Sequence, residues 1–308
     1  MDNIHYEISI FFLFYKLYIK NMNIVNLKKC FIFLIIIIIF ILSFTLNLDN
    51  KKNFYITLTS WKGRMNFIHK NLENLLKNKM KPKKVILNLA KEEFPNKNLE
   101  LPKEILMLLK KYKNFEIFWV NKNNNVFKKL IPTINRFKND LIISLDDDIL
   151  YPNNSIENMI NCYNKLGKKN PISFGTNNSD WNINGKVIHS HYGAGSIVKY
   201  EYYNNKINEL YINTTLNRIN KGIKCPDDVL YTYAALINGY KYIRCKDFYI
   251  DSHLAAQQKL GKPFSEQNTK NFFFSHNQYH KIIRRYIKKK YNITIENLID
   301  NIEKNHHL

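Results

Sequence analysis

The sequence is poor in cysteine, with four in 308 residues, and none of them forms a Cys-x-x-Cys pair. A zinc site or a redox-active pair is therefore not expected. The cysteines are Cys30, Cys162, Cys225 and Cys245. A Cys225–Cys245 bridge stays open if the domain faces an oxidising compartment, although buried free thiols are the simpler expectation.

Acidic residues are also scarce, because 25 Asp and Glu stand against 47 Lys and Arg, for a formal net charge of +22. Such an excess ordinarily suggests a polyanionic partner. The lysines, however, are spread along the chain among abundant asparagine, isoleucine and tyrosine, which is the mixture that an AT-rich coding sequence produces. We therefore predict no nucleic-acid partner. Basic residues around a pocket would instead favour an anionic, phosphate-bearing substrate.

The clearest long hydrophobic run is Phe31–Leu46, which contains no charged residue, glycine or proline. It is slightly shorter than the roughly 20 residues that span a bilayer, but Asn47 and Leu48 extend it. No small-x-small cleavage site follows, which argues against the competing interpretation as a signal peptide. The prediction is an N-terminal segment over residues 1–30 and a single-pass transmembrane helix over residues 31–48. Lysines flank this helix on both sides, so its orientation stays open.

After this anchor, apolar runs with the spacing of strands alternate with helical patterns. Strands are predicted over Asn53–Trp61, Lys83–Ala90, Phe115–Val120 and Leu141–Leu145, and helices over Asn66–Lys79, Leu101–Tyr112 and Phe127–Phe137. This alternation predicts an α/β fold with a mostly parallel central sheet flanked by helices. Ligands of such sheets bind beyond the carboxyl ends of the strands.

The pattern loosens in the second half of the chain. Lys186–Tyr200 is predicted as a strand, a glycine loop and then a strand or helix. A helix is predicted over Cys225–Tyr240, because Pro226 and two acids occupy its first turn and Gly239 ends it. Residues 271–308 form a basic tail with helical periodicity, which we interpret as an appendage near the membrane surface. The predicted catalytic domain therefore spans residues 53–270.

Three consecutive aspartates, Asp146, Asp147 and Asp148, follow the fourth predicted strand within the stretch LIISLDDDILYP. On an extended segment, Asp146 and Asp148 point to one side and Asp147 points to the other. One or two carboxylates, completed by water and substrate phosphates, are the usual ligands of Mg²⁺ or Mn²⁺ in proteins. The motif therefore predicts a divalent-cation site, and a solvated acidic turn is the alternative.

A phosphatase of the haloacid-dehalogenase type also places Asp-x-Asp after a hydrophobic strand. Asp227 and Asp228 would then be its later acidic pair for Mg²⁺. In that fold, however, the motif follows the first strand, whereas here it follows the fourth.

Several segments, in order, resemble nucleotide-sugar-dependent glycosyltransferases of the GT-A fold, whose mark is a DxD motif. More narrowly, they resemble bacterial family-2-like transferases of polysaccharide synthesis. The similar segments are ITLTSWKGR (Ile56–Arg64), KPKKVILNLAKEEFPNK (Lys81–Lys97), LPKEI (Leu101–Ile105), FKKLIP (Phe127–Pro132), ISLDDDILYP (Ile143–Pro152), YGAGSIVKY (Tyr192–Tyr200) and CPDDVLYTYAALINGY (Cys225–Tyr240). The resemblance covers Asn53 to Cys245, and it does not extend to the chain beyond Cys245.

The resemblance implies a donor-binding site with assigned residues. Those that would bind the nucleotide and its diphosphate are Thr57, Ser60, Arg64, Lys128, Lys129, Asp146 and Asp147. Asp146 would lie toward the ribose, and Asp146 and Asp148 would hold Mn²⁺ or Mg²⁺, with His253 as a further candidate ligand. His189 and His191 are weaker candidates for that position.

The resemblance also implies an acceptor side. Gly193 and Gly195 would let the backbone approach the sugar or the acceptor. Asp228, or its neighbour Asp227, would remove the proton of the acceptor hydroxyl. The alternative is that both only stabilise the start of a helix.

The predicted function is thus metal-dependent transfer of a sugar from a nucleotide-sugar donor to a glycan or lipid-linked acceptor, with inversion favoured. The phosphatase and a non-catalytic, membrane-anchored glycan-binding module remain the alternatives.

Overall fold

The computed structural model describes residues 31–38, 54–176, 180–223, 225–250 and 276–306. The chain divides into two units, Met1–Lys52 and Asn53–Leu308. In the first unit, residues 31–38 are helical, and the remainder of the predicted transmembrane segment, residues 39–48, lies outside the described residues. Within the described ranges, no helix has both the length and the apolar character that a membrane span requires.

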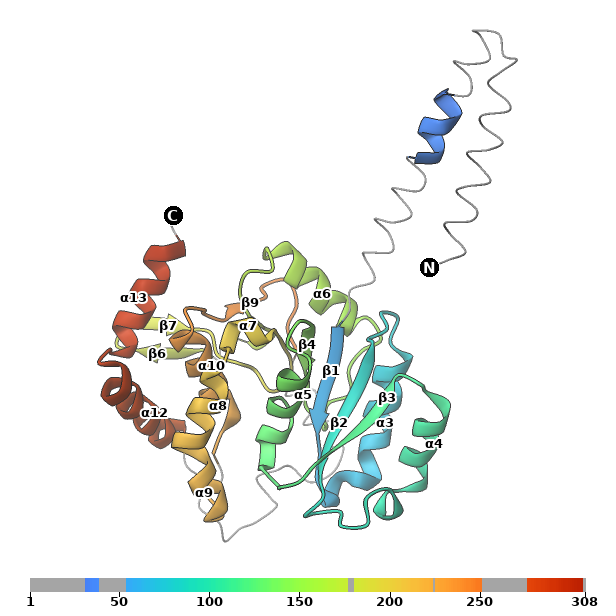
Figure 1. Ribbon diagram of the computed structural model, residues 1–308, viewed down its shortest axis with the longest axis horizontal. Helices are drawn as coiled ribbons and strands as arrows, with labels where there is room; N and C mark the ends of the chain where they lie inside the picture. Colours follow the sequence, from blue (N-terminus) through green and yellow to red (C-terminus); the bar gives the residue numbers. More distant parts are fainter. Residues whose placement is uncertain (1–30, 39–53, 177–179, 224, 251–275, 307–308) are drawn as a thin grey trace, which may run out of the picture. The chain divides into compact units, whose positions relative to one another are not determined.

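The second unit is built on a seven-stranded sheet (Figure 1). From one edge to the other, its strands are β3 (Phe115–Val120), β2 (Lys84–Ala90), β1 (Phe54–Thr59), β4 (Leu141–Ser144), β8 (Ser196–Val198), β5 (Ile172–Ser173) and β9 (Ile243–Arg244). The first four strands are parallel to one another, whereas β8 runs antiparallel to both β4 and β5. β5 and β9 are again parallel. The prediction of an α/β fold with a mostly parallel central sheet is therefore confirmed.

One face of the sheet carries a hydrophobic core with α3 (Met65–Lys77), α4 (Lys103–Lys111) and α6 (Ser155–Lys165). Figure 1 shows α3 and α4 side by side next to β2 and β3. Because side chains alternate along a strand, Ile56 and Leu58 of β1 enter this core. Thr57, between them, points to the opposite face, and this alternation decides its role below.

A second core covers the opposite face and extends into the helical part of the unit. It contains residues of α5 (Ile131–Arg136), α8 (Lys206–Leu210), α10 (Asp227–Ile237), α12 (His276–Tyr291) and α13 (Ile295–His306). Tyr279, Ile283 and Ile287 of α12 are buried in this core, as are Ile295 and Ile299 of α13. The described part of the predicted tail, residues 276–306, is thus an integral part of the domain, and its prediction as an appendage was wrong.

Shorter elements complete the part of the unit that surrounds the second core. The helical stretch between β8 and α10 contains α7 (Tyr200–Tyr203), the π-helix η5 (Tyr211–Leu216) and α9 (Asn217–Asn220). A separate hairpin of β6 (Trp181–Ile183) and β7 (Lys186–Ile188) lies beside the C-terminal helices in Figure 1. An ion pair between Lys186 and Asp300 joins this hairpin to α13.

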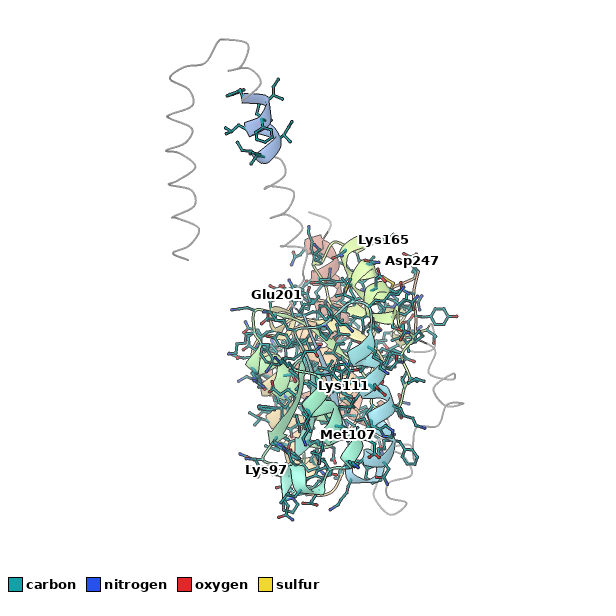
Figure 2. All side chains as sticks on the ribbon, turned by 90° about the vertical axis from the view of Figure 1, so that its right-hand side faces the viewer. Lys97, Met107, Lys111, Lys165, Glu201 and Asp247 are labelled. Carbon is teal, nitrogen blue, oxygen red and sulfur yellow. A yellow bond between two sulfur atoms is a disulfide. The ribbon has the colours of Figure 1, made fainter. Side chains whose placement is uncertain are left out.

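A disulfide connects Cys162 of α6 to Cys245 at the end of β9, across 83 residues of sequence. Cys225 is a buried free thiol. The expectation of buried free thiols holds for Cys225 but is wrong for Cys162 and Cys245. The Cys225–Cys245 pairing considered from the sequence is also wrong, because Cys245 packs with α6 in the first core, whereas Cys225 lies in the second core. A surface ion pair between Lys165 and Asp247 joins the same two segments at 2.6 Å, and Figure 2 labels both residues near one another.

Candidate active site

A cavity of about 260 Å³ lies at the carboxyl ends of the four parallel strands. Each of these strands contributes the residues that follow it. The lining residues are Thr59 at the end of β1, with Ser60, Trp61 and Arg64 after it; Glu93 after β2; Asn123, Asn125, Val126, Lys128 and Lys129 after β3; and Asp146, Asp147 and Asp148 after β4. Gly193, before β8, and Asp227, at the start of α10, complete the wall. This is the edge where open α/β sheets bind their ligands.

The three aspartates follow the end of β4 and are not part of an extended strand. β4 ends at Ser144, and Asp147 and Asp148 form a turn. We refer to Asp146–Asp148 as the aspartate turn. Even so, the carboxylates differ as the strand alternation predicted, because the side chains of Asp146 and Asp148 are each 35% exposed and that of Asp147 is buried. Burial, together with the neighbouring charges of Asp146 and Asp147, raises the pKa of Asp148 to about 6.

Arg64 is the principal cation beside this turn. Its guanidinium is buried, and it pairs with Asp147 through Nη1 and with Asp148 through Nη2, the latter at 2.9 Å. Burial by itself lowers the pKa of Arg64, but the two carboxylates raise it above its usual value. For Asp147, burial raises the pKa against the opposing charge of Arg64. Arg64, expected to contact the nucleotide, thus lines the cavity with its charge engaged by the aspartate turn.

Lys129 is the second buried cation. It follows η3 (Asn125–Lys128), and its Nζ lies 2.9 Å from Asp146 Oδ1 and 3.2 Å from Asp227 Oδ2. Burial lowers its pKa, but these two carboxylates raise it well above the usual value. Burial also raises the pKa of Asp227, and Lys129 opposes that shift. Lys129 therefore connects the aspartate turn after β4 to the start of α10.

Lys128 lies in the same cavity with different partners. Its Nζ donates to Glu93 Oε2 at 2.8 Å and to Asn123 Oδ1 at 2.6 Å. Burial lowers the pKa of Lys128, although Glu93 partly offsets this effect. Lys128, Glu93 and Asn123 form a polar wall, and the indole of Trp61 adds an aromatic surface to the cavity.

The backbone of Asp146 is fixed by a buried tyrosine. Tyr151 Oη accepts a hydrogen bond from the Asp146 amide at 3.0 Å and donates to the Ala194 carbonyl at 2.7 Å. Asn71 donates a further bond to the Asp146 carbonyl. This hydroxyl therefore ties the aspartate turn to the loop that contains Gly193.

The two glycines of that loop have different surroundings. A Cβ on Gly193 would lie 3.1 Å from Asp146 Oδ2 and 3.3 Å from Lys129 Nζ, so a side chain there would press on the ion pair. A Cβ on Gly195 would instead meet Ile250 at 2.6 Å within the first core. Gly193 shapes the cavity, whereas Gly195 serves packing and does not line it.

Thr57 does not line the cavity, although the sequence assigned it to the nucleotide. It points to the face of the sheet opposite the first core and is fully buried. Its hydroxyl donates to the Lys129 carbonyl and lies 2.8 Å from the hydroxyl of Thr133. Asn88 of β2 donates to Thr57 at 2.9 Å and to the Lys129 carbonyl at 3.3 Å. This network holds the backbone of Lys129 and so acts one layer beneath the cavity.

The remaining candidates, two aspartates and three histidines, do not share one location. Asp227 lines the cavity, while Asp228, the next residue of α10, is not part of its lining. His253 lies outside the described residues. His191 is buried and does not line the cavity, with Nδ1 at 2.9 Å from Tyr242 Oη, and His189 pairs with Asp180.

Several lining residues were absent from the sequence prediction, namely Thr59, Trp61, Glu93, Asn123, Asn125 and Val126. Thr59 is the last residue of β1, and the others belong to segments that closely follow β1, β2 or β3. They lie where parallel sheets bind ligands, at the carboxyl ends of the strands, but they are not part of any charged motif.

The residues fit a divalent cation that arrives with a phosphate-bearing ligand. In the part of the chain that the structure describes, no group of three or more His, Cys, Asp or Glu side chains is arranged to hold a metal ion. Two carboxylates suffice for Mg²⁺ or Mn²⁺ when substrate phosphates and water complete the shell. Three cationic and five carboxylate side chains line the cavity, so their ionised net charge of −2 would be neutralised by one divalent cation.

No protein-family model matches the sequence, and no curated protein matches it either. The structure is similar to a mannosyltransferase from Pyrobaculum calidifontis in complex with GDP-Man and Mn²⁺, with 12% identity and a TM-score of 0.40. That similarity covers 62% of this chain and only 54% of the mannosyltransferase.

Two further solved structures are similar over more of the chain. The 1–349 fragment of S. aureus TarS with UDP-GlcNAc has 11% identity and a TM-score of 0.34, covering 80% of this chain and 74% of that one. The UTP-bound UGPase of Acinetobacter baumannii has 11% identity and a TM-score of 0.39, covering 77% and 94%. The structural neighbours are thus nucleotide-sugar transferases and nucleotidyltransferases. At these low scores the similarities carry no argument for a substrate, and the site itself must do so.

Proposed function

We propose that the second unit of the chain, Asn53–Leu308, is a metal-dependent glycosyltransferase of the GT-A type. It transfers a sugar from a nucleotide-sugar donor to a glycan or lipid-linked acceptor. The observation that carries this proposal is the opening of Asp146 and Asp148 into a cavity at the carboxyl edge of a parallel sheet. A nucleoside diphosphate with a divalent cation has the charge and the oxygen ligands that these two carboxylates require.

The donor lies along the walls already described. The nucleoside occupies the part of the cavity formed by Ser60, Trp61 and the wall of Glu93, Asn123 and Lys128. Asp146 and Asp148 would hold Mn²⁺ or Mg²⁺ together with the diphosphate of the donor. When bound, the cation neutralises negative charge on the departing nucleoside diphosphate.

Sugar transfer breaks the bond between the anomeric carbon and the diphosphate oxygen, and that electron pair leaves with the nucleoside diphosphate. The acceptor oxygen forms the new bond at the anomeric carbon, and its proton passes to a carboxylate. We assign this proton to Asp228, with inversion at the anomeric carbon, because Asp228 lies in the first turn of α10 directly after Asp227, which lines the cavity. In this proposal, Asp228→Asn abolishes transfer while donor binding persists.

The membrane enters the proposal through residues 31–48. A single-pass helix there would hold the catalytic domain at a membrane surface, where a lipid-linked acceptor of polysaccharide synthesis is found. Glycan acceptors and lipid-linked acceptors share sugar hydroxyls as the reacting group, so the same domain serves either.

The test is an assay of sugar release and transfer with the full chain in detergent and Mn²⁺. UDP- and GDP-sugars are the donors to screen, beginning with UDP-GlcNAc and GDP-mannose. At least one should be turned over, and Asp148→Ala should abolish that turnover. Asp247→Ala is the matched control, because Asp247 forms a surface ion pair and is not part of the cavity lining.

Two other outcomes would replace the proposal. Release of phosphate from simple phosphomonoesters, with no donor turned over, would indicate the phosphatase. Metal-independent glycan binding without any turnover would indicate a binding module. The position of the aspartates after β4, the fourth strand along the chain, already distinguishes this domain from a phosphatase that carries them after its first strand.

A further inference from the structure

Both carboxylates of the candidate cation site already have a cation from the protein. Asp146 Oδ1 lies 2.9 Å from Lys129 Nζ, and Asp148 Oδ2 lies 2.9 Å from Arg64 Nη2. The two cationic side chains are only 5% and 8% exposed, whereas each carboxylate is 35% exposed. A divalent cation that enters from solvent therefore meets carboxylates whose inner sides are occupied by positive charge.

Lys129 is fixed in this place by its backbone as well as by its ammonium group. Thr57 and Asn88 both donate to its carbonyl, and Nζ contacts Asp227 in addition to Asp146. A buried ion pair of this kind is costly to disrupt, because its partners lose their counter-charge away from water. Lys129 consequently remains beside Asp146 when a cation approaches.

We propose, on the basis of the proposed function, that Lys129 is an internal competitor of the divalent cation and a positioning residue for Asp227. Without a nucleotide, the charge on Lys129 keeps the affinity of Asp146 and Asp148 for Mn²⁺ low. A bound diphosphate supplies further anionic oxygens, so the cation enters together with the donor. The same lysine holds Asp227 at the wall of the cavity.

A purely structural role for Lys129 predicts the opposite effect on cation binding. If the lysine only stabilised the fold, its removal would loosen the site, and Mn²⁺ would bind more weakly. If it competes with the cation, its removal strengthens Mn²⁺ binding. The direction of the change therefore separates the two roles.

The experiment titrates the full chain in detergent with Mn²⁺ alone and follows the electron paramagnetic resonance signal of free Mn²⁺. We expect Lys129→Met to bind Mn²⁺ about tenfold more tightly than the wild type, a gain of about 1.4 kcal/mol. Lys129→Arg retains the charge and should stay within about threefold of the wild type. No gain, or a weaker affinity, in Lys129→Met would overturn the proposal.

Lys128→Met is the matched control for general electrostatics. It removes a positive charge from the same cavity, but the ion pair that it breaks is with Glu93 and not with an aspartate. Its gain in Mn²⁺ affinity should be clearly smaller than that of Lys129→Met, because Coulomb energy falls with distance and the ion-pair partner of Lys128 is Glu93. A gain equal to that of Lys129→Met would show that only net charge matters, and would overturn the proposal.

The double variant Lys129→Met/Asp227→Asn serves if Lys129→Met does not fold. It removes one positive and one negative charge, so the net charge of the cavity is unchanged. Because residue 227 of α10 is then an uncharged asparagine, it no longer needs the lysine as its counter-charge. It should still bind Mn²⁺ more tightly than the wild type, and equal or weaker binding would overturn the proposal. The Mn²⁺ titration needs no sugar donor, so its result is independent of donor turnover. The titration decides the role of Lys129, whereas donor turnover decides the proposed function.

Discussion

At the scale of single residues, the candidate site is a balance between carboxylates and buried cations. Arg64 forms ion pairs with Asp147 and Asp148, and Lys129 forms ion pairs with Asp146 and Asp227. Removing one partner from such a pair leaves a buried charge uncompensated, which costs roughly 3–5 kcal/mol. Conservative changes that retain charge or volume are therefore the informative ones.

Tyr151 offers such a change, because its hydroxyl joins the Asp146 amide to the Ala194 carbonyl. We expect Tyr151→Phe to lose about 1–2 kcal/mol of stability and to reduce turnover strongly, since the aspartate turn is no longer fixed. Tyr163→Phe is the control, because its buried hydroxyl bonds instead to Tyr202 and the Lys168 carbonyl. Comparable losses of turnover in both variants, measured alongside urea unfolding, would contradict this role.

His191 predicts how stability depends on pH. Burial, with a smaller effect from Lys129, lowers the pKa of His191 well below its usual value of 6.5. Below pH 6.5 the unfolded chain binds a proton that the folded protein does not, so stability is lost as the pH falls. Between pH 7 and pH 5 the wild type should lose about 2 kcal/mol more than His191→Gln in urea unfolding. Equal losses would show that His191 protonates in the folded state.

At the scale of elements, the cavity is made by loops that follow parallel strands, and helices set their positions. The sequence allowed most of these elements to be predicted, because apolar periodicity in β1 to β4 and α3 to α4 is strong. It did not allow the end of β4 to be predicted, since Leu145 continues the apolar run although the strand stops at Ser144. Thr57 was misassigned because a polar residue in a strand can face either a ligand or a buried network, and only the fold decides.

The disulfide between α6 and β9 is a second test at this scale. Replacing both Cys162 and Cys245 by alanine should lower the free energy of unfolding by about 2–4 kcal/mol, because the closed loop is long. A reductant should lower the melting temperature of the wild type and leave the double variant unchanged. Cys225→Ala should remain sensitive to the reductant, since Cys225 is a free thiol. A wild type that melts at the same temperature with and without reductant would contradict the bridge.

At the scale of the whole molecule, the second unit has two cores on opposite faces of one sheet. The first core comes from contiguous strand–helix alternation and was therefore readable in the sequence. The second joins segments far apart in the chain, such as Tyr279 of α12 and Thr215 of η5, whose hydroxyls bond to one another. The sequence of a basic helix with apolar periodicity does not show which distant segment it packs against. For this reason α12 and α13 were predicted to be a tail.

The central claim is that the cavity binds a nucleotide-sugar donor together with a divalent cation. Its most direct measurement is the melting temperature of the full chain across UDP- and GDP-sugars, each with and without Mn²⁺. At least one donor should raise the melting temperature only with Mn²⁺, because a ligand at one hundred times its dissociation constant adds about 2.7 kcal/mol. Asp148→Asn should abolish this shift. A flat response across all donors, with and without Mn²⁺, would contradict the claim.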